Sequence, residues 1–165
     1  MLFRWIKDRQ QYLKRLREAS LRYPVSVLNY MVTGNHVHLL LRAENPGSVA
    51  AAMQFLSGCA AQDYNRRKKR EGVFWRGRYR PTLVESGRHL TRCFFYMELN
   101  MVRAGVVKHP GEWVGGAFRE HTGERKRYRI IDRPALLDCM DCPDPDRFGE
   151  WYVETLRQEC ATGYH

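Results

Sequence analysis

Two apolar segments joined by turn residues constrain the fold of this chain more than any other feature. Residues 24–32 are rich in branched and aromatic side chains, which favours a β-strand, and residues 36–42 predict the returning strand of a hairpin. Residues 33–35 between them have turn chemistry. His36 and His38 belong to the returning strand, where residues two apart point to one face. The pair predicts either the start of a divalent metal site or two half-buried, hydrogen-bonded histidines.

Helical periodicity surrounds this hairpin. The chain has 165 residues and 44% hydrophobic residues, which is enough for one globular domain with a core. Residues 7–22 predict a helix whose apolar stripe is Leu13, Leu16 and Leu21. Three further helices are expected over residues 49–69, 88–102 and 148–159.

An arginine-rich segment over residues 73–80 predicts another strand. Its arginines alternate, so they would share one face of a strand, with the aromatic residues on the opposite face. A basic face beside aromatics suits phosphate contact with base stacking nearby, and the alternative is an edge strand protected by its arginines. The arginines are Arg76, Arg78 and Arg80, and the aromatics are Trp75 and Tyr79.

Positive charge is concentrated in the middle of the chain. Residues 64–129 hold 17 Lys and Arg against 6 Asp and Glu, whereas the rest of the chain holds 11 and 12. A localised basic region favours a polyanionic partner, most often nucleic acid, over a merely soluble surface. No apolar run is long enough to cross a bilayer, so no membrane partner is expected. Five irregularly spaced cysteines suggest reduced thiols and a cytoplasmic location.

A tyrosine, an amide and an arginine share one side of the helix expected over residues 88–102. Tyr96, Asn100 and Arg103 are spaced four and three residues apart. A tyrosine can attack a phosphodiester and form a phosphotyrosine ester, while a divalent metal polarises the phosphate. One helix would then supply the nucleophile and, through Asn100, a third ligand beside the two histidines, with Arg103 or Arg92 holding the strand backbone. Taken singly, Tyr96 also fits a packing role and Asn100 a helix cap.

Three segments together resemble one known family. NHVHLLL at residues 35–41 is similar to the histidine–hydrophobe–histidine strand of HUH-type single-strand transposases. FWRGRY at residues 74–79 resembles a WQGRY signature of that family, and YMELNMVRAG at residues 96–105 resembles its YIELNPVRAG block. The segments occur in the family's order, and the resemblance extends from about Phe3 to about Phe118. The branch that they resemble most is the REP-associated tyrosine transposases of the IS200-like family.

The resemblance implies an α+β fold. The expected architecture is a ferredoxin-like αβ-plait with an antiparallel sheet and flanking helices over residues 1–120, followed by a C-terminal helical extension of unassigned role over residues 121–165. Family members begin with a strand ahead of the first helix. Because Phe3 stands almost at that helix, the plait is expected to lack this N-terminal strand.

The resemblance also implies a reaction. Tyr96 would be the nucleophile, and His36, His38 and Asn100 would bind Mg²⁺ or Mn²⁺. The protein, a monomer or homodimer at the nucleoid, would nick and rejoin single-stranded, hairpin-forming repeat DNA through a 5′-phosphotyrosine intermediate. The alternatives are a defective relative that binds hairpin DNA without cutting it, and a metal-dependent nuclease that uses water. The residues expected to contact DNA are Arg66, Arg67, Lys68, Lys69, Trp75, Arg76, Arg78, Arg80, Arg92 and Arg103.

Overall fold

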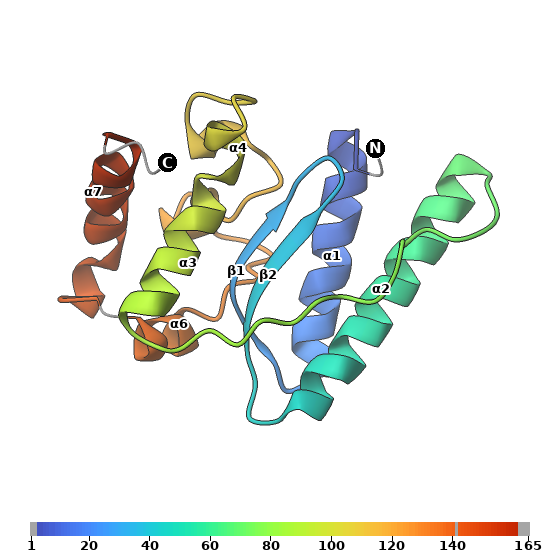
Figure 1. The fold of residues 1–165 in the computed structure, drawn as a ribbon, viewed down its shortest axis with the longest axis horizontal. Coiled ribbons are helices and arrows are strands. Elements are labelled where there is room, and N and C mark those ends of the chain that lie inside the picture. The colour runs from blue at the N-terminus through green and yellow to red at the C-terminus, as the bar shows by residue number, and fades with distance from the viewer. Residues whose placement is uncertain (1–2, 141, 162–165) are drawn as a thin grey trace.

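The computed structural model describes residues 3–140 and 142–161, which form an α+β fold (Figure 1). A two-stranded antiparallel hairpin lies between two groups of helices, as expected of the fold class. The elements in chain order are α1 (Ile6–Arg22), β1 (Ser26–Val32), β2 (Val37–Arg42), α2 (Pro46–Lys68), α3 (Arg88–Glu98), α4 (Asn100–Arg103), η1 (Pro110–Glu112), α5 (Phe118–His121), α6 (Arg133–Cys139), η2 (Pro145–Arg147) and α7 (Phe148–Ala161).

The hairpin forms where the sequence predicts it. Val32 pairs with Val37 and Met31 with His38, and the register shifts once between Val27 and Asn29 on β1. The turn is closed by Thr33, whose backbone amide donates to the His36 carbonyl and whose hydroxyl accepts from the His36 amide, both at 2.9 Å. His36 therefore lies immediately before β2, and both its amide and its carbonyl group are hydrogen-bonded to Thr33.

The two helical groups lie on opposite sides of the hairpin, with α1 and α2 on one side and α3 and α7 on the other (Figure 1). The α1–α2 pair is tied by Asp63, which accepts hydrogen bonds from Gln11 at 2.9 Å and from Arg15 at 2.6 Å. Leu16 of α1 and Leu56 of α2 are almost fully buried. The helices α1, α3 and α6 contact β1, and β1 pairs with β2, so the strand that carries the histidines is held through its partner strand.

Later segments of the chain complete the free edge of β1. The amide of Val32 donates to the Gly115 carbonyl at 2.8 Å, and the amide of Asp132 donates to the Val27 carbonyl at 2.9 Å. A Cβ at residue 115 would lie 2.2 Å from the Val32 carbonyl oxygen, so this approach requires glycine. Residues beyond α4 therefore form part of the same core as the hairpin.

Two expectations about individual elements are wrong. Leu21 is 71% exposed, because it lies five residues after Leu16 and falls off the buried stripe of α1. Residues 73–80 form no strand and run as an irregular connector from α2 to α3 (Figure 1). The neighbours Phe74 and Trp75 both pack inward, with ring centroids 4.7 Å apart, and two successive inward side chains are incompatible with the alternation of a strand.

None of the helices in residues 3–140 and 142–161 combines the length and apolar character needed to cross a membrane. All five cysteines are free thiols.

Candidate active site

The two histidines of the hairpin project together, as predicted. Their rings stack with centroids 6.4 Å apart and an interplanar angle of 15°. His36 is exposed and His38 is half-buried. Burial, together with the neighbouring His36, lowers the pKa of His38 and so favours its neutral imidazole, the form that binds metals.

The histidine face of the hairpin is also the face that meets α3. Residues paired across antiparallel strands project to the same side, and the register pairs Met31 with His38 and Asn29 with Leu40. The Asn29 amide donates to the carbonyl of Phe94, in the middle of α3, at 3.4 Å. His38 and Asn29 thus project from the same face of the sheet, and Asn29 contacts α3, the helix that carries Tyr96.

Tyr96 is accessible on that helix. It is 57% exposed, although the residues on either side of it in the chain, Phe95 and Met97, are buried. The Arg103 guanidinium lies 5.0 Å from the centre of the Tyr96 ring. The helical path is interrupted at Leu99 and resumes at Asn100, yet the predicted alignment of Tyr96 with Arg103 survives the interruption.

His36 and His38 alone are too few protein ligands for a divalent cation. The His36 and His38 rings lie side by side, but the described part of the chain contains no cluster of three or more His, Cys, Asp or Glu side chains that would bind an ion. An amide oxygen is a ligand type that suits Mg²⁺ or Mn²⁺. Asn100, half-buried at the start of α4, is the residue that the sequence proposes as a third ligand.

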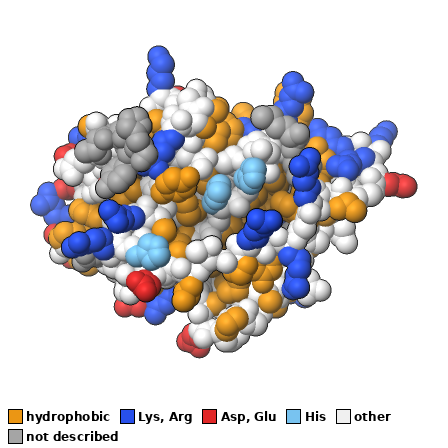
Figure 2. Space-filling view, in the orientation of Figure 1, with side chains coloured by type: hydrophobic (Ala, Val, Ile, Leu, Met, Phe, Trp, Pro, Cys, Tyr) orange, Lys and Arg blue, Asp and Glu red, His pale blue; other side chains and the backbone are white. Residues whose placement is uncertain are grey.

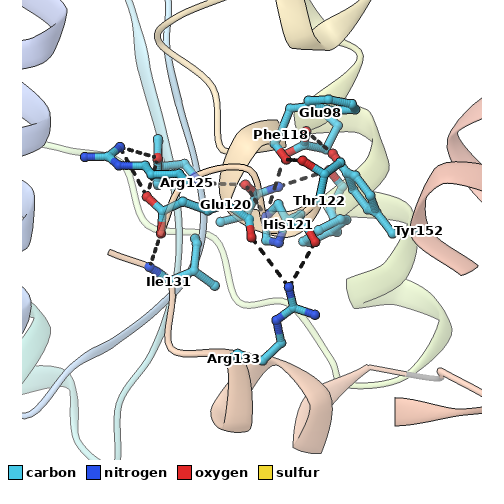
Figure 3. A network of polar contacts seen from close by, with 12 residues as sticks. Glu98, Phe118, Glu120, His121, Thr122, Arg125, Ile131, Arg133 and Tyr152 are labelled. Carbon is cyan, nitrogen blue, oxygen red and sulfur yellow. Dashed lines mark hydrogen bonds and ion pairs between the residues drawn. The ribbon is translucent and has the colours of Figure 1, made fainter. Parts of the chain in front are cut away.

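A buried polar network surrounds Glu98, two residues after Tyr96 in the chain, and was not foreseen from the sequence (Figure 3). Glu98, 1% exposed, accepts a 2.6 Å hydrogen bond from the Tyr152 hydroxyl of α7. Its second oxygen lies 3.9 Å from Nε2 of the buried His121, and that nitrogen lies 3.4 Å from Oδ1 of Asn29. The network therefore joins β1, α3, α5 and α7 around one carboxyl group.

Burial controls the charges in this network. It raises the pKa of Glu98 to about 7, because ionising a carboxyl away from water is unfavourable. It lowers the pKa of His121 to about 3, so the imidazole stays neutral. The sequence does carry a signal for Glu98, since a carboxylate beside the apolar stripe of Phe94 and Met97 must find a partner when it is buried.

Most of the arginines predicted to contact DNA have exposed side chains. Arg76, Arg78 and Arg80 are exposed on the connector between α2 and α3, and Arg92 and Arg103 are exposed on the helices near Tyr96. Figure 2 shows a pair of neighbouring histidine side chains near the middle of one face, with Lys and Arg side chains on both sides of the pair. These placements bring basic groups to the face that displays histidines.

Trp75 is occupied by packing. Its indole nitrogen donates to the Ser57 carbonyl of α2 at 2.9 Å, and its ring contacts Phe3, Tyr12 and Phe74. The stacking role expected for Trp75 on DNA stays a prediction, in competition with this core contact.

The basic end of α2 is partly paired. Arg66 bonds to Asp63 at 2.9 Å, and Arg67 forms an ion pair with the buried Asp8. Lys68 is exposed, and Lys69 ends the helix in a left-handed conformation with φ of 49°.

A family model described as "Transposase IS200 like" matches residues 3–98, a segment that includes the histidine pair and Tyr96 and ends two residues before Asn100. No curated protein and no solved structure matches the chain. The match covers more than half of the chain, and the chain belongs to the IS200-like transposases, a family of DNA transposases.

Proposed function

We propose that this protein is a metal-dependent tyrosine transposase that nicks and rejoins single-stranded, hairpin-forming DNA through a 5′-phosphotyrosine intermediate. The observation that carries the proposal is the placement of the stacked His36–His38 pair on the sheet face that meets α3, the helix that presents an exposed Tyr96. Membership in a DNA transposase family supports the choice of substrate class.

In the proposed reaction the Tyr96 hydroxyl oxygen attacks the scissile phosphorus. A bond forms between that oxygen and phosphorus, and the bond from phosphorus to the 3′ oxygen breaks. The phenolic proton passes to solvent, and the departing 3′ oxygen takes up a proton to become a 3′-hydroxyl. The protein keeps the 5′ phosphate, so a later attack by a 3′-hydroxyl reverses the step and rejoins the strands.

The surrounding residues have separate tasks in this scheme. Arg103, stacked on the Tyr96 ring, binds the strand phosphate and orients the phenol. His36, His38 and Asn100 would hold the cation. Bound there, Mg²⁺ or Mn²⁺ would neutralise charge on the phosphate oxygens.

The proposal is tested with hairpin-bearing single-stranded oligonucleotides labelled at either end and incubated with Mg²⁺. A 3′ label is expected to migrate with the protein on a denaturing gel, whereas a 5′ label is released on a free fragment. Tyr96→Phe abolishes both products, and Tyr128→Phe, at another exposed tyrosine, leaves them unchanged.

Two other outcomes would replace the proposal. Cleavage without a protein adduct, retained in Tyr96→Phe, would indicate a nuclease that uses water. Binding without any cleavage would indicate a hairpin-binding relative that has lost catalysis.

A further inference from the structure

We propose that Trp5, flanked by Arg4 and Lys68, is a stacking site for an unpaired base of single-stranded DNA. The inference rests on the proposed function, from which it takes its single-stranded partner. It adds a contact outside the residues so far considered for DNA.

The indole of Trp5 lies on the surface although its backbone is fixed. The Trp5 side chain is 56% exposed. Its carbonyl accepts from the Asp8 amide at 3.0 Å, at the start of α1, and its amide donates to the Asp8 carboxylate at 3.3 Å. A large aromatic ring held at a defined place on the surface loses little conformational freedom when a ligand stacks on it.

The surroundings of Trp5 are cationic. The Arg4 guanidinium lies 5.1 Å and the Lys68 ammonium 6.0 Å from the centre of its ring, and both side chains are exposed. The nearby carboxylate, Asp8, is 4% exposed and paired with Arg67, so it presents little negative charge to a ligand. An exposed aromatic ring with cations beside it is the chemistry that binds a base on the ring and the adjoining phosphates at the cations.

This patch is attached to the hairpin turn that carries the histidine pair. The amide of Phe3 donates to the Gly34 carbonyl at 2.9 Å, two residues before His36. The buried Arg9 donates to the carbonyls of Phe3 at 2.8 Å and Arg4 at 3.3 Å, which fixes the segment that leads to Trp5. The stacking site therefore lies at the turn end of the hairpin, next to His36, where a single strand bound at the histidines can reach it.

The test measures binding without divalent metal, so it does not depend on strand cleavage. Affinities for a labelled oligothymidine and for a duplex of equal length are compared among variants. Trp5→Ala is expected to lose roughly 10-fold in affinity for the single strand and to keep its affinity for the duplex. Trp5→Phe keeps a ring and retains most of the affinity. Arg4→Gln is expected to lower the slope of log single-strand affinity against log salt by the amount that corresponds to about one phosphate contact.

The matched control is Tyr128→Ala. Tyr128 is 69% exposed and lies 5.6 Å from the Arg17 guanidinium, so it is also an exposed ring beside a cation. Its removal is expected to leave single-strand affinity unchanged.

Three results would overturn the inference. The first is unchanged single-strand affinity in Trp5→Ala, and the second is an equal loss in Tyr128→Ala. The third is a shift of Trp5→Ala from dimer to monomer on gel filtration with unchanged DNA affinity, which would assign the exposed indole to an interface between copies. If Trp5→Ala lowers single-strand affinity but the protein forms no tyrosyl adduct with DNA, the proposed function is refuted and the stacking site is still supported.

Discussion

Replacing Glu98 by Gln should change how the stability of this protein depends on pH. The Glu98 carboxyl is 1% exposed, and burial raises its pKa from 4.5 to about 7. Glutamine has nearly the same shape and keeps an oxygen that accepts from the Tyr152 hydroxyl, but it cannot ionise. The substitution therefore isolates the free energy of placing a negative charge at this position.

The direction of the effect follows from proton binding. Between pH 4.5 and about 7 the unfolded chain has released the Glu98 proton while the folded protein retains it, so the free energy of unfolding falls as pH rises. A pKa raised from 4.5 to about 7 corresponds to a loss of about 3 kcal/mol, complete a little above pH 7. His121, whose pKa burial lowers to about 3, acts in the opposite direction, because only the unfolded chain takes up its proton as pH falls below 6.5.

Urea unfolding followed by tryptophan fluorescence measures this difference. Since His121 contributes to both proteins, it cancels when the wild type is compared with Glu98→Gln. The variant should gain about 3 kcal/mol over the wild type between pH 4.5 and pH 8. Glu150→Gln, which removes an exposed carboxylate of α7, is the control and should show no such gain. Parallel wild-type and Glu98→Gln curves over this range would refute a buried, protonated Glu98.

Three further outcomes are expected. His36→Ala should abolish Mg²⁺-dependent cleavage while retaining metal-free DNA binding, and undiminished cleavage would exclude the histidine site. Arg78→Ala should lower the slope of log affinity against log salt by about 0.7 on single strands, and an unchanged slope would remove Arg78 from the interface. Tyr152→Phe should destabilise the protein by about 1–3 kcal/mol at pH 8 in urea unfolding, because the Glu98 carboxylate loses its donor. Tyr128→Phe, on the surface, should leave stability unchanged, and equal stability of both variants would contradict the network.

The features that were predicted correctly from the sequence depend on the short residue repeat of a strand or a helix. Alternation over residues 36–42 was enough to place His36 and His38 together, because a strand has a period of two. Helical spacing was enough to bring Arg103 onto Tyr96, although the helix is interrupted at Leu99. Both interactions are local in the chain, where backbone geometry decides which side chains meet.

The features that the sequence did not predict depend on distant contacts. The Glu98–Tyr152 bond joins residues that are 54 positions apart, and no local pattern indicates which hydroxyl approaches the buried carboxyl. The alternating arginines over residues 73–80 favoured a strand, but burial of Phe74 and packing of Trp75 on Ser57 determine the path of that segment. Tertiary packing overrides local alternation there.

The most direct test of the central claim is to identify which tyrosine carries the DNA. The covalent complex formed with a single-stranded hairpin oligonucleotide and Mg²⁺ is digested with protease and nuclease, and the modified peptide is sequenced by mass spectrometry. We predict a phosphodiester on Tyr96 alone. A modification on Tyr79 or Tyr128, the other two exposed tyrosines of the described chain, would contradict it, as would strand cleavage with no modified tyrosine.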